Sequence, residues 1–481
     1  MEIVPIPVLS GLYVDGRPDV RVALPVNMVP IPSQEGIADG YLSPAEGIQA
    51  LALGPGVDRG GVVWGDSSGT GGGVHYRVMG TDLVSVTATG AITTIGSVGG
   101  SGPVRMDFSF DRLGILSGGL LWYWNNTTLI QVTDVNIPAS LIDMVWVDGY
   151  WMVTDGTVIA VSTLADPTTF NATSYSGTDR PDPIKALLKV LNEVHVVSRS
   201  FIDVFQNVGG TGFPFSRVNN AVITKGAIGT RTACVFDDKV AVLGGGRSAS
   251  NNEELPSIHL AHNAQSLRIS TLEIDRLLTG YTTAQLAAVF VESVVHPGAR
   301  FLFVHLPDRT IVYDAMASAV VGQPVWHIRT SALQGFSLYK ARYITRAHDT
   351  WVVGDTSSSA IGTWVHTGSQ HYGLPVRWEF STPMLRNKGV GAALHQLELL
   401  ALTGAVTIGT NPTIATSYTE DGELFTQDYA IPSGAIGDRA KKLLWLNLGR
   451  WNGFRIHRFR GDSASRLSAL LINAGISPLR F

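Results

Sequence analysis

The sequence predicts a mainly β protein: a six- or seven-bladed β-propeller with a helical insertion, an extended N-terminal arm and a C-terminal β-sandwich-like domain. From residue 58 to 368, short apolar strands alternate with tight polar turns in units of about 35 to 50 residues, as propeller blades require. Glycine accounts for 53 of 481 residues and only 15% are charged, so the chain is rich in turns and poor in charge. A second β-rich stretch, residues 369–481, follows the repeats.

The first 57 residues are predicted to form the extended arm. Proline removes a backbone donor and fixes φ, so a proline-dense segment forms its own sheet poorly and lies along another surface. That surface belongs either to this subunit or to a neighbour. The prolines of the segment are Pro5, Pro7, Pro18, Pro25, Pro30, Pro32, Pro44 and Pro55.

The repeating units from 58 to 368 have the pattern of propeller blades. In one unit, strands are predicted at Leu141–Val147, Tyr150–Thr154 and Val158–Val161, separated by the turns Asp148-Gly149 and Asp155-Gly156. Asp-Gly between alternating apolar residues is typical of a tight hairpin. A stacked array of β-sandwiches is the main structural alternative.

Helices are predicted at two places among the strands. Pro183–Leu191 has the apolar spacing of a short helix. The insertion near 270–292 begins with capping-box spacing at Ser270–Glu273 and continues, after a break, with a second helix over Thr283–Val291. This helical hairpin is expected to decorate the edge of a blade.

Residues 369–481 are predicted to form a separate sandwich-like domain with turns at Asp421-Gly422 and Asn452-Gly453. Its predicted strands are Val376–Ser381, His395–Ala401, Ile414–Tyr418, Lys442–Leu448, Phe454–Phe459 and Arg466–Ile472.

Charge is unevenly distributed along the chain. Residues 1–370 carry a net charge of -8 and residues 371–481 one of +4. Seven basic residues and no acidic residue lie between Arg439 and Arg460, so this stretch is a candidate to meet a partner surface or phosphate. A solvated strand face is the alternative. The partner-contact candidates are Arg450, Arg455, Arg458 and Arg460.

No cofactor or metal site is expected from the sequence. The single cysteine, Cys234, cannot form an intrachain disulfide and is interpreted as a core residue of a strand. The pair His259 and His262 lacks further ligands at zinc spacing. The N-terminus lacks the basic start of a signal peptide, and glycine, serine and threonine interrupt the uncharged stretch Leu83–Val104. We expect a protein that neither inserts into a membrane nor is exported by a cleaved signal.

No catalytic constellation stands out, so an enzyme is not expected. Gly65–Gly69 matches G-x-S-x-G, but the glycine-rich sequence after it cannot start the helix that a nucleophile elbow needs. The adjacent carboxylates Asp237-Asp238 and Glu253-Glu254 lie in turn-like sequence, where neighbouring side chains diverge.

Several collinear segments between residues 9 and 355 resemble the packaged-DNA stabilisation proteins, also called tail hub or nozzle proteins, of short-tailed bacteriophages (podoviruses). The Leu24–Pro30 segment and the strand pair around His305–Pro307 and Val312–Ala315 are specific in combination. The matching segments are Leu9–Tyr13, Leu24–Pro30, Gly40–Leu42, Lys225–Thr230, Ile274–Glu292, His305–Pro307 and Val312–Ala315.

The resemblance implies a structural virion protein of the phage tail, assembled in the host cytoplasm. Such proteins form a homohexameric ring beneath the portal and its adaptor (the head-to-tail connector), extend the DNA channel, retain the packaged genome and release it at ejection. Tail needle, spike or fibre proteins are the further expected partners, and double-stranded DNA passes without specific binding. An acidic body suits a conduit, because carboxylates on the wall repel phosphates. The assembly-interface candidates are Leu24, Pro25, Val26, Asn27 and Met28.

Two alternatives from other function classes stay open at this point. One is a glycan-binding or glycan-cleaving propeller, which would gather carboxylates at the central cavity. The other is a sequence-independent DNA binder that uses Arg439–Arg460.

Overall fold

The structure, a computed structural model, describes residues 2–9, 11–14, 20–33, 39–65, 73–178, 180–210, 212–247, 253–296, 298–387 and 390–479. The chain divides into two compact units. The propeller unit contains residues 50–307 and 340–363, and the sandwich unit contains residues 1–49, 308–339 and 364–481.

Within the described residues, seven antiparallel sheets have four strands each. Five of them lie wholly in the propeller unit. The first sheet consists of β7 (Asp58–Trp64), β8 (Val74–Met79), β9 (Asp82–Val86) and β10 (Ile92–Ser97). The second consists of β11 (Arg105–Phe108), β12 (Leu113–Ser117), β13 (Leu120–Trp124) and β14 (Leu129–Gln131). The third sheet consists of β15 (Asp143–Val147), β16 (Tyr150–Thr154), β17 (Ile159–Thr163) and β18 (Asp166–Ser176). The fourth consists of β19 (Ile184–Val190), β20 (Glu193–Ser198), β21 (Ile202–Asn207) and β22 (Phe215–Arg217).

The remaining three sheets follow in chain order, and the last of them takes in a strand from near the N-terminus. They are β23 (Ala233–Phe236), β24 (Lys239–Gly244), β25 (Ser257–His262), β26 (Gln265–Arg268); β27 (Phe290–His296), β28 (Ala299–His305), β29 (Thr310–Asp314), β30 (Val325–Arg329); and β31 (Arg342–Ala347), β32 (Thr350–Gly354), β33 (Ala360–Val365), β6 (Gly47–Leu53).

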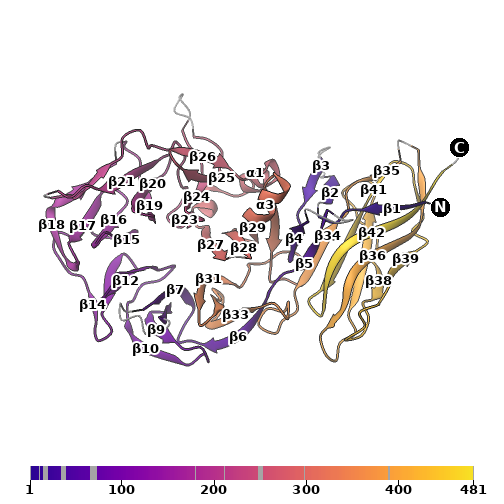
Figure 1. Cartoon of the computed structure of the whole chain (residues 1–481), viewed down its shortest axis with the longest axis horizontal. Helices are drawn as coiled ribbons and strands as arrows, with labels where there is room; N and C mark the ends of the chain where they lie inside the picture. The colour runs from indigo at the N-terminus through magenta and orange to yellow at the C-terminus, as the bar shows by residue number, and fades with distance from the viewer. Residues whose placement is uncertain are drawn as a thin grey trace. The chain divides into compact units, whose positions relative to one another are not determined.

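The first strand of each sheet lies at the centre of the propeller unit. These strands, β7, β11, β15, β19, β23, β27 and β31, adjoin one another in order, and β31 returns to β7. Figure 1 shows the strands arranged around one centre. The predicted β-propeller is therefore confirmed, and it has seven blades.

The turn chemistry explains why the strands double back locally. Asp148 and Gly149 join β15 to β16 with φ of 48° and 86°. Positive φ at both positions is the requirement of a type I′ hairpin, which aspartate and glycine satisfy best. The Asp237-Asp238 pair between β23 and β24 has φ of 49° and 58°, so these two carboxylates occupy a turn, as predicted.

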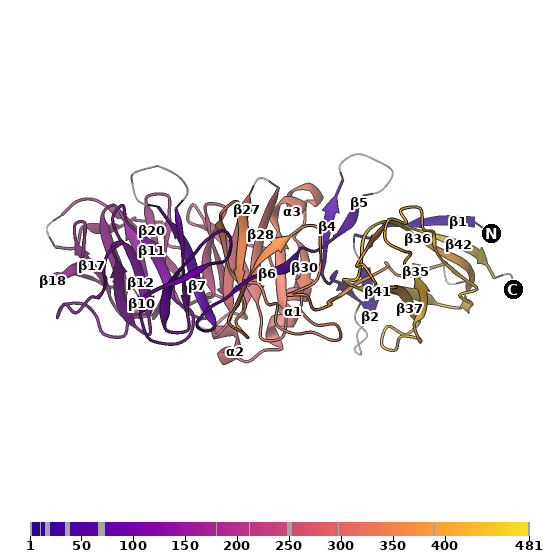
Figure 2. The same ribbon diagram turned by 90° about the horizontal axis from the view of Figure 1, so that it is seen from below.

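The helical insertion consists of α1 (Leu272–Thr279) and α2 (Thr283–Ala287). The capping box lies at Thr282 and Gln285 of the second helix, whereas α1 is capped by Thr271 alone. The second helix ends earlier than predicted, because the chain enters β27 at Phe290. Figure 2 views the propeller from its side, with α2 at its lower face.

The helix predicted at Pro183–Leu191 is wrong. Residues Ile184–Val190 form β19, an inner strand buried on both faces. Neighbouring blades cover each face of such a strand, so its apolar residues do not alternate with polar ones. A short run of this kind cannot be told from a helix by periodicity.

The sandwich unit is built on two further sheets. The first has the order β39 (Leu443–Leu446), β36 (Ala392–Val406), β42 (Ser465–Pro478), β5 (Gly40–Pro44), β4 (Met28–Pro32), with β1 (Glu2–Ile6) on β42 and β40 (Arg450–Trp451) on β36. The second has the order β34 (Arg377–Ser381), β41 (Phe454–Asp462), β37 (Thr413–Thr419), β38 (Tyr429–Pro432), with β35 (Leu385–Arg386) on β41. Outside these sheets lie the pair β2 (Gly11–Val14) and β3 (Val20–Ala23), and α3 (Ala315–Val321).

Aromatic side chains form the core of the sandwich unit. The ring of Phe380 stacks on that of Phe459 with centroids 5.2 Å apart, and Trp445 meets Phe459 edge to face at 5.5 Å. Ile6 and Val8 from the N-terminal segment belong to the same buried cluster. Burying rings of this size supplies much of the stability of a small domain. The predicted C-terminal β-sandwich is confirmed.

The N-terminal arm does lie along other parts of the chain, as its prolines indicate. Strands β1, β4 and β5 join the first sandwich sheet, and β6 is the outer strand of the seventh blade. The division of the chain at 57/58 and 368/369, and the assembly role of the arm, stay predictions.

Candidate assembly and partner-binding site

Asn27 lies at the centre of the Leu24–Met28 segment and connects three parts of the sandwich unit. Its side-chain amide donates to the carbonyl oxygens of Thr330 at 2.9 Å and Arg377 at 2.7 Å. Its Oδ1 accepts from the backbone N–H of Thr330 at 3.1 Å, and its own N–H donates to Ile328 O at 2.8 Å. The residue has a φ of 50°, which asparagine tolerates better than most residues.

The structure shows how much of this segment, the predicted assembly interface, is accessible within one chain. Pro25, Val26, Asn27 and Met28 are buried within the sandwich unit, and Leu24 alone is partly exposed. Side chains buried in their own chain cannot form a surface for a neighbour. The contact of the segment with a neighbouring subunit stays a prediction, and Leu24 is its most accessible residue.

Arg455 is an internal residue of the sandwich unit rather than a surface residue. Its side chain is 1% exposed and pairs with the carboxylate of Glu420, with Nε 3.1 Å from Oε1. Nη1 donates to Leu448 O at 2.6 Å, and Nη2 donates to Arg450 O at 2.8 Å. The guanidinium also lies 3.8 Å from the centre of the Tyr418 ring. Its predicted contact with a partner protein is not favoured, because the side chain is buried and each of its nitrogens donates inside the chain.

Arg458 and Arg460 differ in exposure. Arg458 is partly buried, covers the ring of Phe425 at 4.0 Å and donates to Ser417 Oγ at 3.2 Å. Burial lowers the pKa of its guanidinium from the usual value. Arg460 is exposed and pairs with Asp428 through Nε at 2.6 Å.

Arg450 is also exposed, so Arg450 and Arg460 are the two candidates of the four that a partner could reach. The aromatic residues of the Arg439–Arg460 stretch do not add to this surface. Trp445 and Trp451 are 3% and 2% exposed, whereas Leu446 is 58% exposed. These two tryptophans therefore belong to the core of the domain.

Carboxylates of the inner propeller strands bind the backbone of the next blade. Asp107 on β11 accepts the N–H of Trp146 on β15 at 2.7 Å, and Asp143 on β15 accepts that of Leu187 on β19 at 2.8 Å. In the same way, Glu292 on β27 accepts the N–H of Ile344 at 2.8 Å. These bonds close the ring by linking one inner strand to its neighbour.

Basic side chains reach across the centre of the propeller. Arg105 Nε lies 3.3 Å from Asp143 Oδ1. Arg231, next to β23, lies with Nη1 3.7 Å from the same oxygen and donates to Pro103 O at 3.5 Å. Arg231 thus connects the fifth blade with the third blade and with the segment that precedes the second blade. Burial lowers the pKa of Arg231.

The other carboxylates near the centre are paired as well. Asp58 binds the guanidinium of Arg77 through both oxygens, with Nε 2.8 Å from Oδ1, and neither side chain is exposed. Glu292 Oε1 lies 2.8 Å from His305 Nε2. Burial raises the pKa of the neighbouring Tyr343 to about 12 and that of Cys234 to about 12. A glycosidase needs one carboxyl free to protonate the substrate and another free to attack or activate water, whereas these carboxylates are engaged.

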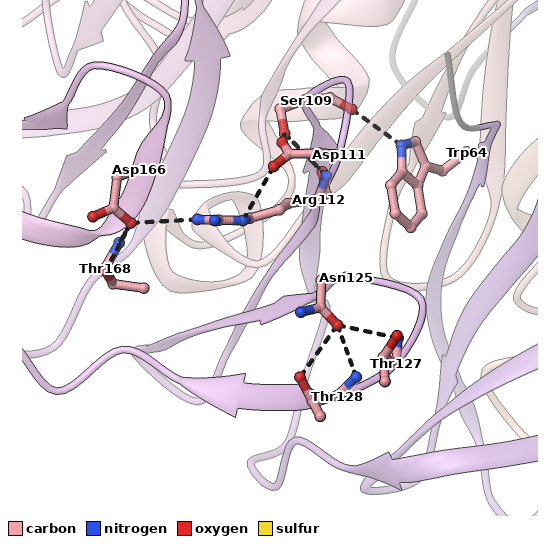
Figure 3. Close-up of polar contacts among 9 residues, drawn as sticks. All are labelled: Trp64, Ser109, Asp111, Arg112, Asn125, Thr127, Thr128, Asp166 and Thr168. Atoms are coloured by element: carbon pink, nitrogen blue, oxygen red, sulfur yellow. Dashed lines mark hydrogen bonds and ion pairs between the residues drawn. The ribbon is translucent and has the colours of Figure 1, made fainter. Parts of the chain in front are cut away.

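Side chains also join neighbouring blades at other places (Figure 3). The indole N–H of Trp64 on β7 donates to Ser109 O of the second blade at 3.0 Å. Arg112 of the second blade lies 3.3 Å from Asp166 Oδ1 of the third. Partial burial acts to raise the pKa of Asp166, but hydrogen bonds from Thr168, Thr169 and Arg112 outweigh this effect. The pKa of Asp166 is therefore lowered.

These central residues were not singled out from the sequence. The available signal was a charged residue inside an apolar strand, as in Asp143 of DMVWV and Glu292 of FVESVVH. Such a residue is buried only when it is paired, so it indicates a structural contact between strands.

The remaining sequence motifs give no reactive site. Asp66–Gly69 of the G-x-S-x-G match lies outside the described residues. Cys234 is on β23, as predicted, and is partly exposed. Among the described residues, no group of three His, Cys, Asp or Glu side chains is placed to hold a metal ion. In the same residues, no helix has the length and apolar character to cross a membrane.

Comparison with solved structures gives only weak similarity. The chain is similar to the N-terminal domain of Nup159, with a TM-score of 0.40 and 8% identity over 71% of this chain and 98% of that one. It is also similar to virginiamycin B lyase of Staphylococcus aureus, with a TM-score of 0.41 and 11% identity over 66% and 99% of the two chains. Neither likeness bears on function.

Sequence comparison is more specific. The family model described as bacteriophage P22 Gp10, beta-propeller, matches residues 4–369, and that described as bacteriophage P22 Gp10, beta-sandwich, matches residues 377–477. The tail hub protein gp10 of Salmonella phage P22 is 24% identical over 470 residues, which cover 94% of each chain. With both of its domains matched in order, the chain belongs to the bacteriophage P22 Gp10 family.

Proposed function

We propose that this chain is the tail hub subunit of a short-tailed phage: a structural virion protein that extends the portal-adaptor channel, retains packaged DNA and allows its ejection. The observation that carries the proposal is the collinear similarity to a tail hub protein over 94% of both chains. The proposal includes a homohexameric ring, contacts with the portal adaptor and with needle, spike or fibre proteins, and assembly in the host cytoplasm.

The geometry of the propeller limits where DNA could pass. Arg105 and Arg231 meet Asp143 across the centre of the ring, and a buried carboxylate such as that of Asp143 is held in place by its partners. A duplex therefore does not pass through a single propeller. The channel is proposed to be enclosed by several copies of the chain, with each propeller forming part of its wall.

The charge distribution supports the same role. Residues 1–370 carry a net charge of -8, and an acidic wall avoids the salt-dependent binding that basic residues give to phosphates. The genome can then slide without adhering. The proposal includes no enzymatic activity, and the glycan-cleaving alternative is not favoured because the carboxylates near the propeller centre are paired.

A nonsense mutation in the gene for this chain tests the proposed function. Heads should package DNA and then lose it, so that a nuclease degrades the genome in the purified particles. Supplying the chain in trans should restore protection, and electron microscopy of the rescued particles should show a six-fold ring below the portal. Stable, DNA-filled particles without the chain would contradict the proposal.

A further inference from the structure

Arg342 is an unpaired arginine among the inner strands of the propeller unit. It is the first residue of β31, and it is only partly exposed. Its side chain makes no hydrogen bond or ion pair with the described residues. Burial lowers the pKa of its guanidinium, as expected for a charge that has left water without gaining a bonded carboxylate. A charge in this position is costly unless an anion meets it.

The carboxylates in this part of the ring are bound to other groups. Glu292 raises the pKa of Arg342 from a distance, but its own oxygens bind His305 and a backbone N–H. Asp58 binds the guanidinium of Arg77 through both oxygens. Neither carboxylate therefore serves as the counter-ion of Arg342.

Two further arginines reach the centre with loosely held donors. Arg105 Nε and Arg231 Nη1 lie 3.3 and 3.7 Å from Asp143 Oδ1, whereas a charge-assisted hydrogen bond measures about 2.7 to 2.9 Å. Asp143 Oδ1 accordingly has no hydrogen bond. The two arginine side chains are 29% and 15% exposed, so a small ligand can reach them from solvent.

Tyr343 connects these arginines to one another. Burial is the main cause that raises the pKa of Tyr343, and nearby Arg342 and Arg231 both act to lower it. Because both guanidinium groups act on one phenol, they lie in the same part of the ring. A phenol can also donate one hydrogen bond to an oxyanion.

Positive charge exceeds negative charge around these residues. Five guanidinium groups lie with three carboxylates, an excess of two positive charges, in a chain whose residues 1–370 carry a net charge of -8. Protonated His305 does not add to the excess, because burial lowers its pKa. A local excess of this kind favours a bound anion. The guanidinium groups are those of Arg59, Arg77, Arg105, Arg231 and Arg342, and the carboxylates are those of Asp58, Asp143 and Glu292.

We propose that the centre of the propeller binds one small oxyanion with the chemistry of phosphate. Arg342, Arg231 and the hydroxyl group of Tyr343 hold it, and Arg105 lies at the rim. Guanidinium groups match the oxygens of phosphate with paired N–H donors. The phosphate group can come from free inorganic phosphate or from a nucleotide. This inference goes beyond the tail hub function and does not rest on it, because the site lies within one chain.

Titration calorimetry of the purified full chain in a chloride buffer tests the site. Inorganic phosphate and AMP are the two probes, and we expect one bound phosphate group per chain. Tighter binding of AMP would identify a nucleotide as the source, and tighter binding of inorganic phosphate would identify the free anion. Failure of both probes to bind would overturn the proposal, as would loss of binding when sodium chloride replaces phosphate-buffer ions at equal ionic strength.

Substitutions then test the contacts. Arg342→Gln should weaken phosphate binding at least tenfold without lowering the melting temperature in phosphate-free buffer, because no internal hydrogen bond is lost. Arg342→Lys keeps the charge and should bind with intermediate affinity. Arg346→Gln is the matched control on the same strand: Arg346 is exposed and pairs with Asp349, so this variant should bind phosphate like the wild type.

Phosphate should also raise the melting temperature of the wild type and of Arg346→Gln, because a ligand that binds only the folded state stabilises it. It should leave the melting temperature of Arg342→Gln nearly unchanged. Equal phosphate affinity of the wild type and Arg342→Gln would refute the site and leave the tail hub function standing.

Discussion

Asn27 gives a physical reason for the Leu24–Pro30 segment on which the family resemblance depends. The residue combines a φ of 50° with side-chain hydrogen bonds to Thr330 and Arg377. Few residue types tolerate this backbone conformation and also offer both a donor and an acceptor. The sequence pattern could be recognised, but its structural role depends on segments about 300 and 350 positions away.

Replacing this residue should therefore affect stability. Asn27→Ala leaves buried backbone groups without partners and places alanine at positive φ, so we expect a loss of about 3 kcal/mol in the free energy of unfolding. Urea titration measures this loss. Asn452→Ala, at an exposed position of the same unit, should change the free energy by less than about 0.5 kcal/mol. A loss below about 1 kcal/mol for Asn27→Ala would refute this role.

The basic residues of β41 should differ in how much they contribute to the free energy of unfolding, measured by the same urea titration. Arg455→Met leaves Glu420 and two carbonyl oxygens without their donor, and we expect a loss of about 2 kcal/mol because the Glu420 side chain is half exposed. Arg460→Gln removes only a surface pair, so its loss should stay below about 1 kcal/mol. Attachment of tail components, measured by pull-down, should respond to Arg460→Gln and Arg450→Gln. Equal stability of the Arg455 and Arg460 variants would contradict the assignment.

At the scale of the strands, the sequence predicted the blades well where turns and alternation are local. Asp148-Gly149 marks a hairpin through backbone requirements that four residues can reveal. The error at Ile184–Val190 arose because both faces of β19 are buried by neighbouring blades. Burial of this kind depends on long-range packing, which a single sequence does not display.

The contacts between inner strands were not predictable either, and they can be tested. Asp143→Ala leaves the N–H of Leu187 and the guanidinium groups of Arg105 and Arg231 without their partner, so we expect a loss of about 3 kcal/mol. Asp143→Asn keeps an acceptor and should lose less. Asp349→Asn is the control, because the Asp349 side chain is fully exposed and asparagine also tolerates positive φ. A loss below about 1 kcal/mol for Asp143→Ala would show that the blades close without this contact.

In the whole molecule, strands from the two ends of the chain share sheets. β1 pairs with β42, and β6 completes the blade that begins with β31. The proline-rich composition of the N-terminal segment indicated that it lies along other parts of the protein, but pairing partners about 470 positions apart leave no local signal. For this reason the assembly role of the segment is still a proposal, although its strands are located.

The buried histidines predict how the whole molecule responds to acid. Burial, assisted by nearby Arg77, lowers the pKa of His75 to about 3. Burial and nearby Arg455 lower the pKa of His457 to about 3. Burial lowers the pKa of His259 to about 4. These imidazoles are neutral in the fold but take up protons below about pH 6.5 when unfolded. Stability is therefore lost as the pH falls from about 6.5 toward 3 to 4, at about 1.4 kcal/mol per histidine and pH unit.

Urea unfolding at pH 7.5 and 5.5 measures this dependence before the carboxylates titrate. Burial raises the pKa of Asp58, which opposes the trend and gains weight as the pH is lowered further. The three histidines together should cost about 4 kcal/mol between the two pH values. His457→Gln should reduce the difference by about 1.4 kcal/mol, because glutamine takes up no proton in the unfolded chain. His395→Gln, at an exposed position, should leave the difference unchanged. The free energy of unfolding could instead change with pH by the same amount in His457→Gln and in the wild type. That result would show that the His457 imidazole is protonated in the fold.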